Sequence, residues 1–434
     1  MLASQALRLA YQWVDALWVR GLGVEATAAV TSSIFVVWWV LSLNDIFQMG
    51  VVAYTSQLLG AGQRARAGVA AYKGLRASAL LGLTGTAMGL LGARAIFRAM
   101  GADAALMKSG PAYLSVILSG APLFMVAETC ASIMRASGNT RVPLLFDLAA
   151  VGLNAVLSPF LIYGIGPFPR LGVAGAAWAT VSAQLTLIVL FLGIAARRHP
   201  AFPLARHADG PPVRILGLAR VGLPAALIGG LFSVVYLAFA RAASQFGPAS
   251  MAIVGIANRI EALLFMMSVA IGIAGAALVG QNLGADRPER AVATLRTGTV
   301  WVLWIGTLLT IVVGVFADRF LSLFTPDADV HRLGVPYLRV LVLCFIATGL
   351  EVVTAESVMG SGHTRALSAI YTVFSLMRIP LAFVVPALTH SGVIGIAWVI
   401  TVTCIVRTIL ILAWAWRRTW LTGLKRELAA AEAG

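Results

Sequence analysis

The sequence predicts an all-α polytopic membrane protein with twelve transmembrane helices, and three observations support this fold class. Of the 434 residues, 60% are hydrophobic and only 11% are charged, whereas a soluble domain carries about a quarter charged residues. The apolar residues form runs of roughly twenty, which is the length of a helix that spans a bilayer. Short breaks rich in Gly, Pro and Arg separate these runs. The composition therefore excludes an ordinary water-soluble protein.

The apolar runs define twelve expected helices, and their even number places both chain termini on one side of the membrane. Lys and Arg near the helix ends are more frequent on that side, so the positive-inside rule makes it the cytoplasm. We therefore expect a multi-pass protein of the cell inner membrane or plasma membrane with both termini cytoplasmic. The expected helices cover residues 3–20, 26–58, 68–93, 109–134, 142–163, 172–195, 219–241, 249–282, 292–316, 333–359, 367–388 and 393–416.

Charge and motif content exclude several other classes of protein. The net charge of +15 fits cytoplasmic loops that collect Lys and Arg better than a nucleic-acid partner. Cys130, Cys344 and Cys404 lie inside apolar runs at wide spacing, so they read as small core side chains. The chain has no HExxH, no nucleotide-binding GxxxxGK(S/T) loop and no His cluster. We therefore expect no enzymatic activity, no cofactor and no metal centre.

An internal repeat relates the two halves of the chain. Position 281 follows position 57 by 224 residues, and three further pairs of segments match at the same offset. Both halves would then contain six helices and enter the membrane from the same side. This parallel-repeat architecture is typical of secondary transporters, whose substrate site lies near the bilayer midplane. The matched segments are 57–61 with 281–285, 103–104 with 327–328, 113–114 with 337–338, 137–141 with 361–365 and, at an offset of 220, 172–178 with 392–398.

The repeat also predicts the domain boundaries. A long polar break separates the halves, so we expect an N-terminal six-helix lobe over 1–196 and a cytoplasmic linker over 197–218. A C-terminal six-helix lobe over 219–416 and a cytoplasmic tail over 417–434 follow. At the repeat offset of 224, the residues that introduce the seventh helix correspond to positions before Met1. We therefore expect that the product begins upstream or that the first helix is short at its cytoplasmic end.

Ionisable residues inside membrane helices are candidates for function because placing them there costs several kcal/mol. Asp15 lies in a first helix that has few other polar residues. Asn154 and Ser158 are one helical turn apart and therefore share a helix face, and Pro159 frees a backbone carbonyl in the preceding turn. Carboxylate, amide, hydroxyl and carbonyl oxygens suit a small hard cation or a proton relay. We expect Arg407, near a cytoplasmic helix end, to extend towards the interface.

Other polar and aromatic side chains in the expected helices are candidates for contact with a substrate. Aromatic faces attract organic cations, although anchoring at the membrane interface is the alternative role for Trp and Tyr. A structural ion pair between helices is the alternative for Glu261. These substrate-lining candidates are Trp38, Tyr54, Tyr163, Trp178, Asp45, Glu261 and Arg378.

Several of these motifs together resemble the multidrug and toxic compound extrusion (MATE) transporters, over nearly the whole chain. The resemblance implies twelve-helix antiporters with two lobes that expel organic cations in exchange for protons or sodium ions. It implies that Asp15 is the main coupling carboxylate, with Asn154 and Thr180 beside it. Similar transporters usually carry Asp where this chain has Ser158, and the lost charge disfavours sodium. The matching segments are 14–15, 21–23, 26–29, 57–61, 135–141, 153–159, 172–180 and 281–285.

We therefore expect a secondary antiporter that exports organic cations or drugs in exchange for protons. The cation-coupling residues would be Asp15, Asn154, Ser158 and Thr180, and a sodium ion held by Asp15, Asn154 and Thr180 is the alternative to protons. The other partners would be membrane lipids, with no nucleic acid, and the protein would act as a monomer. A flippase of similar architecture for lipids or lipid-linked substrates is the alternative function.

Overall fold

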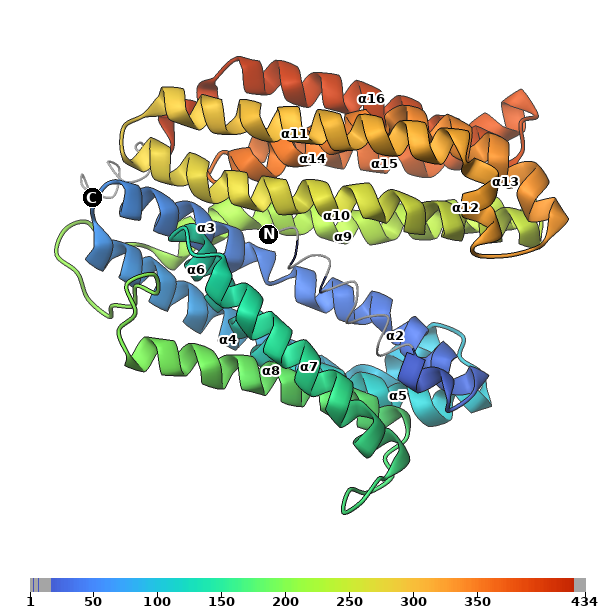
Figure 1. The fold of residues 1–434 in the computed structure, drawn as a ribbon, viewed down its shortest axis with the longest axis horizontal. Helices are drawn as coiled ribbons and strands as arrows, with labels where there is room; N and C mark the ends of the chain where they lie inside the picture. Colours follow the sequence, from blue (N-terminus) through green and yellow to red (C-terminus); the bar gives the residue numbers. More distant parts are fainter. Residues whose placement is uncertain (1–2, 4–6, 8–16, 425–434) are drawn as a thin grey trace. The chain divides into compact units, whose positions relative to one another are not determined.

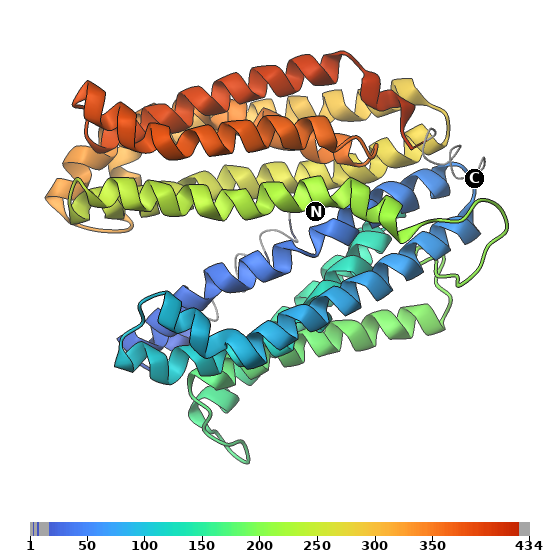
Figure 2. The ribbon, with the colours of Figure 1, turned by 180° about the vertical axis from the view of Figure 1, so that it is seen from behind.

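The computed structural model describes residues 3, 7 and 17–424, and every regular element among them is a helix. The chain divides into two compact units. We call the described residues up to Ala226 the N-terminal unit and Leu227–Leu424 the C-terminal unit. Figure 1 labels the helices of both units, and Figure 2 shows the same ribbon from behind.

The N-terminal unit consists of long helices in antiparallel succession. The expected helix 26–58 is divided at Leu43 and Asn44, and the expected helix 109–134 is bent by 45° at Gly120. Pro122 lies in the first turn after that bend, where its missing N–H leaves no hydrogen bond unmade. The helices are α2 (Val24–Ser42), α3 (Asp45–Gly60), α4 (Arg64–Ala99), α5 (Ala104–Ser119), α6 (Ala121–Ala136), α7 (Arg141–Tyr163), α8 (Val173–Ala196) and the beginning of α9 (Ile215–Ser244).

Glycines bring the helices of the N-terminal unit into close contact. A Cβ at Gly82 would lie 2.4 Å from the Cα of Pro122, and one at Gly89 would lie 2.4 Å from the Cβ of Leu118. With Gly85 between them, these glycines form a row of small residues on α4 that faces α5 and α6. Small residues allow such approach between membrane helices, so helix packing explains this glycine motif.

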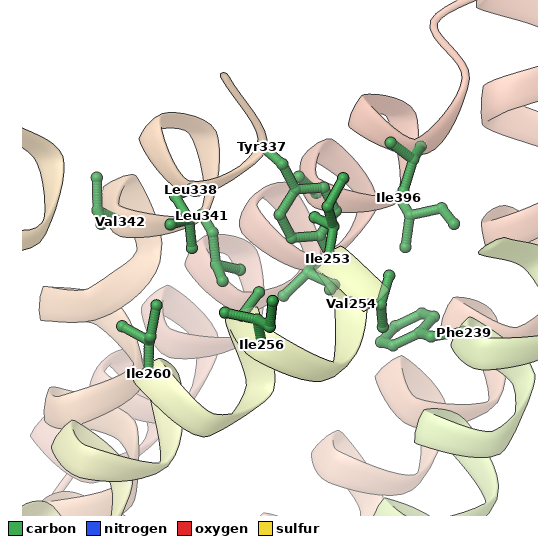
Figure 3. Close-up of a cluster of buried hydrophobic side chains, with 14 of the residues drawn as sticks. Phe239, Ile253, Val254, Ile256, Ile260, Tyr337, Leu338, Leu341, Val342 and Ile396 are labelled. Carbon is green, nitrogen blue, oxygen red and sulfur yellow. The ribbon is translucent and has the colours of Figure 1, made fainter. Parts of the chain in front are cut away.

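The C-terminal unit packs its helices around an apolar core (Figure 3). Phe239, Ile260 and Tyr337 are among its fully buried side chains. Cys344 and Cys404 also lie in this core, and both contact the hydroxyl of Thr348. The helices are the remainder of α9, α10 (Pro248–Gly284), α11 (Pro288–Val315), α12 (Ala317–Ser322), α13 (Ala328–Leu341), α14 (Phe345–Met359), α15 (Arg365–Thr389) and α16 (Val393–Trp416), with short 3-10 turns at Val342–Cys344 and Thr419–Thr422.

The number of membrane crossings agrees with an all-α polytopic protein. Ten helices in the described part of the chain are long and apolar enough to span a membrane, or eleven if the bent pair α5 and α6 forms one span. The expected first helix, 3–20, lies mostly outside the described residues. The three cysteines are buried and unpaired, as the sequence predicted.

The linker between the halves packs against the N-terminal unit. Residues 197–214 lie outside any helix, and α9 begins at Ile215. Ser137 Oγ donates a hydrogen bond to the carbonyl of Ala201 (2.5 Å), and Lys73 Nζ donates one to the carbonyl of Val213 (2.7 Å). Helix α9 continues without a break from the N-terminal unit into the C-terminal unit. The lobe boundaries inferred from the sequence stay a prediction.

Candidate functional site

Helices α7 and α8 of the N-terminal unit hold three of the predicted coupling residues. The side chains of Asn154 and Ser158 on α7 are fully buried, and Thr180 on α8 is nearly so. Asn154 Nδ2 donates a hydrogen bond to Thr180 Oγ1 (3.3 Å), and Thr180 Oγ1 donates one to the carbonyl of Ala176 (3.0 Å). The structure therefore brings Asn154 and Thr180 together, whereas Asp15 lies outside the described residues.

The close approach of α7 and α8 depends on a glycine. The two helices lie side by side in Figure 1 and Figure 2, and a Cβ at Gly175 would lie 2.3 Å from the carbonyl oxygen of Leu161. Any larger residue at Gly175 would push α8 away from α7. The Gly172–Trp178 segment that marks the repeat therefore has a structural purpose, because it brings Thr180 within reach of Asn154.

The site offers buried neutral oxygen atoms. Thr180 uses its proton for the carbonyl of Ala176, so its oxygen accepts from Asn154. Ser158 Oγ is buried and has no hydrogen-bond partner within residues 17–424. A buried hydroxyl without a partner costs free energy of order 1–3 kcal/mol, so this oxygen is suited to contact an ion or another polar group.

A second polar cluster of the N-terminal unit was not predicted as a site. Gln48 Nε2 on α3 donates to Glu128 Oε1 (3.2 Å) and to Ser132 Oγ (2.8 Å), both on α6. Arg135 donates to the same two oxygens at 2.5 Å and 2.8 Å. Asn44 Nδ2 reaches the cluster through Gln48 Oε1 at 3.3 Å. The one-turn spacing of Asn44 and Gln48 was a signal in the sequence that could have revealed this network.

The substrate-lining candidates of the N-terminal unit have different surroundings. Trp38 and Trp178 are each 45% exposed. Tyr54 is buried, and its hydroxyl would lie 2.5 Å from a Cβ at Gly217. Tyr163 donates a hydrogen bond to the backbone carbonyl of Trp18 (2.8 Å). Asp45 is half-buried in the first turn of α3.

Glu261 and Arg378 belong to a polar and aromatic cluster inside the C-terminal unit. Tyr236 Oη donates a hydrogen bond to Glu261 Oε2 (2.7 Å). Arg378 interacts electrostatically with Glu261, and its Nε donates to Thr403 Oγ1 (2.7 Å). The Tyr236 ring lies 4.5 Å from that of Phe232, which is stacked on the Phe265 ring at 5.9 Å. The cluster therefore combines both signs of charge with aromatic faces.

Arg407 corrects one expectation from the sequence, because it does not extend to the interface. Its guanidinium is buried and donates to both carboxylate oxygens of Glu351, with Nε to Oε2 at 2.8 Å. Thr408 Oγ1 donates to Glu351 Oε2 at 3.2 Å, and the Tyr371 ring lies 4.4 Å below the guanidinium carbon. The sequence could not reveal this pair because its members are 56 positions apart.

Comparison with known proteins places the chain among membrane transporters. The MatE family model matches residues 1–160 and 224–384, which fall in the two halves. The probable multidrug resistance protein YoeA of Bacillus subtilis is 26% identical over 407 residues, covering 92% of this chain and 87% of that protein. A FAD transporter of Shewanella oneidensis is 27% identical over 389 residues, covering 89% and 85%.

A similar solved structure shows the fold. An outward-facing multidrug resistance MATE family transporter of the MOP superfamily superposes with a TM-score of 0.89 at 24% identity. The match covers 100% of this chain and 94% of that one. The predicted fold class, twelve helices in two lobes, is therefore confirmed.

Proposed function

Since the chain belongs to the multidrug and toxic compound extrusion (MATE) family of transporters, we propose that it is a secondary antiporter that exports organic cations or drugs in exchange for protons. Family membership makes it a multi-pass membrane protein. The observation that supports the proposal most is the buried set Asn154, Ser158 and Thr180, because it places an amide and two hydroxyl groups on neighbouring helices and leaves Ser158 Oγ without a partner within residues 17–424.

In the proposed mechanism, Asp15 is the carboxylate that a proton and a cationic substrate use in turn. Protonation from outside removes its charge and weakens the hold on the cation. Thermodynamic linkage then requires that bound substrate disfavour protonation by the same factor. The hydrogen bond between Asn154 and Thr180 keeps both side chains on the shared face of α7 and α8. These two residues position the site, and Asp15 carries the charge.

The charge balance of the site favours protons over sodium ions. A hard metal cation needs several oxygen ligands and enough negative charge to offset its dehydration. The proposed site has a single carboxylate, Asp15, and the oxygens of Asn154, Ser158 and Thr180 are neutral. A proton needs only one group that titrates. We further propose that the transporter acts as a monomer, since each step of the mechanism uses one chain. The excess of Lys and Arg at one set of helix ends supports cytoplasmic termini in the inner or plasma membrane.

Transport measurements in proteoliposomes test the proposal. The purified chain should export a fluorescent organic cation when only a pH gradient is imposed at clamped voltage. A sodium gradient alone, at equal pH on both sides, should drive no transport. Transport under the sodium gradient would contradict proton coupling. Lipid scrambling without cation transport, measured on the same vesicles, would favour the flippase function.

A second candidate function concerns anionic aromatic substrates. Arg378 is only partly buried and hydrogen-bonds a hydroxyl and a backbone carbonyl rather than a carboxylate. The stacked rings of Phe232 and Phe265 lie in the same cluster through Tyr236, and one relative is named a FAD transporter. Adding flavin dinucleotide to the substrate panel tests this candidate. Export that Arg378→Gln abolishes, with cation export unchanged, would support it.

A further inference from the structure

The first turns of α4 and the linker bring several cations together at one end of the N-terminal unit. Arg76 is the last charged residue before the uncharged stretch 77–93, which is long enough for most of a bilayer crossing. The cations of α4 before that stretch therefore lie at the membrane interface. The linker follows them, since a Cβ at Gly68 on α4 would lie 2.8 Å from the backbone nitrogen of Ala205.

Arg66 is buried beneath the linker without a compensating negative charge. Its side chain is 8% exposed, and a Cβ at Gly210 of the linker would lie 3.7 Å from its Cδ. Nη1 donates to Gln63 Oε1 at 2.5 Å, but Nε and Nη2 are buried and have no partner within residues 17–424. Leaving two charged donors unsatisfied is costly, so these donors call for an acceptor.

Two further guanidinium groups share a single aromatic ring farther along α4. Arg76 of α4 and Arg206 of the linker lie 5.8 Å and 5.9 Å from the centroid of the Tyr72 ring. In the described part of the chain neither forms an ion pair with a carboxylate, and the only acid of the linker, Asp209, is exposed. Like charges held close together repel, so an anion between them would be stabilising.

The linker itself is fixed, so the cations form a built site. Arg64 donates to the carbonyl of Pro200, and Lys73 donates to that of Val213. Phe202 and Val213 bury their side chains against the unit. Backbone carbonyls therefore hold the linker on α4, and in the described part of the chain none of Arg66, Arg76 and Arg206 forms an ion pair with a carboxylate.

We propose that Arg66, Arg76 and Arg206, along this end of α4 and the linker, form a cationic surface that binds the phosphate groups of anionic phospholipids at the membrane surface. Arginine is the side chain best suited to phosphate because its planar guanidinium donates two parallel hydrogen bonds. Cationic segments next to membrane helices attract anionic headgroups. The site lies apart from the residues proposed for transport, and so does not depend on the proposed function.

The repeat supplies a matched control for this site. Position 290 follows position 66 by the same 224 residues, and Arg290 is exposed at the start of α11. The structure buries Arg66 under the linker, whereas no such segment covers Arg290. An Arg290→Gln variant therefore removes the same charge from the equivalent position without affecting the proposed site.

The test measures phospholipid binding to the purified full-length transporter in detergent, by native mass spectrometry and by thermal melting. Phosphatidylglycerol should bind and raise the Tm, and phosphatidylcholine should not. Arg66→Gln should weaken phosphatidylglycerol binding about tenfold or more, whereas Arg290→Gln should bind like the wild type. Arg206 lies at an exposed linker position, and Arg206→Gln should also weaken phosphatidylglycerol binding. This variant tests the proposal if Arg66→Gln does not fold.

The outcomes separate the possible sources of the phosphate group. Equal binding by wild type, Arg66→Gln and Arg206→Gln would overturn the proposal, as would equal stabilisation by phosphatidylcholine. Millimolar inorganic phosphate is the second arm. Stabilisation by inorganic phosphate but not by phosphatidylglycerol, lost in the same variants, would overturn the lipid as the source of the phosphate group. Transport activity is not part of the readout.

Discussion

The pair of positions that meet across α7 and α8 in the N-terminal unit also meet across α15 and α16 in the C-terminal unit, with different chemistry. Asn154 corresponds to Arg378 at the offset of 224, and Thr180 corresponds to Ile400 at the offset of 220. Asn154 donates to Thr180 Oγ1, and Arg378 donates to the carbonyl of Ile400 at 3.3 Å. The geometry of the repeat is retained, while a neutral amide has become a permanent cation.

The remaining counterparts follow the same trend. Ser158 corresponds to Ala382, and position 15 corresponds to Phe239, and both C-terminal side chains are buried in the apolar core. At these two positions the C-terminal unit has neither a carboxylate nor a hydroxyl, and the carboxylate of the neighbouring cluster, Glu261, interacts with the permanent cation Arg378. The two units therefore share the repeated helix packing but differ in the polar groups at these positions, and our proposal places reversible ion binding in the N-terminal unit.

The two units also differ at a pair of buried positions that hold neighbouring helices together. Glu351 and Arg407 form a buried ion pair in the C-terminal unit. Their counterparts in the N-terminal unit are Ala127 and Leu187, which lie in one small apolar cluster. The same location is therefore held together by charge in one unit and by apolar contact in the other.

The largest effect is expected from Asp15→Asn, which removes the titrating group and keeps its shape. Transport driven by a pH gradient should fall to background, while expression and insertion are retained. Glu289→Gln, an exposed carboxylate at the start of α11, serves as the control and should transport normally. Wild-type transport by Asp15→Asn in proteoliposomes would show that Asp15 does not carry the coupling charge.

The next effect concerns the ion pair of the C-terminal unit. Glu351→Ala leaves Arg407 buried and unpaired and should cost about 3–5 kcal/mol of stability. The double variant Glu351→Ala with Arg407→Leu copies the apolar residues of the N-terminal unit and should recover most of that loss. Thermal melting in detergent compares the stability of both variants with that of the wild type. A double variant less stable than the single one would mean that the pair itself stabilises the fold.

A smaller effect is expected from Asn154→Ala, which removes the hydrogen bond to Thr180. Such a bond contributes about 1 kcal/mol, so the rate of pH-driven transport should fall about fivefold. Thr186→Ala on α8, the helix that carries Thr180, is the control, because its hydroxyl donates to the carbonyl of Ser182 within that helix. Equal rates in the two variants would remove Asn154 from the coupling site.

The smallest effect is expected from Ser158→Asp, which should gain the ability to bind sodium ions. A second carboxylate in the proposed coupling site adds the negative charge that a sodium ion requires, so we expect the variant to bind sodium. We expect sodium to raise the Tm of this variant by a few degrees and to leave the wild type unchanged. Ser158→Asn adds size without charge, so it separates the effect of the negative charge from the effect of a larger side chain. A sodium response in the wild type would argue against proton coupling.

Much of the fold was accessible from the sequence because membrane helices are encoded by local hydropathy. The expected helices 142–163, 172–195 and 393–416 nearly coincide with α7, α8 and α16. The division at Val342–Cys344 was missed because that segment is apolar and contains no Pro or Gly, whereas the division at Leu43 and Asn44 had a signal in the polar residues Ser42, Asn44 and Asp45. The bend at Gly120 did have a signal in Gly120, Ala121 and Pro122 that hydropathy alone overlooked.

The candidate site was accessible only where its signal was local. The spacing of Asn154 and Ser158 predicted a shared face, and the family resemblance added Thr180. The contacts of Tyr236 with Glu261 and of Glu351 with Arg407 join separate helices. Which helices become neighbours depends on packing surfaces such as Gly175 against Leu161, and a single sequence does not encode that choice in any local pattern.

The burial of all three cysteines has a practical consequence for measuring movement. Cys130, Cys344 and Cys404 are 5%, 0% and 2% exposed, and none forms a disulfide. Thiols enclosed in apolar surroundings react slowly with labelling reagents. Single cysteines introduced at exposed positions could therefore carry spin labels or fluorophores in the otherwise natural chain. Distances between the two units could then be followed through a transport cycle without first building a cysteine-free protein.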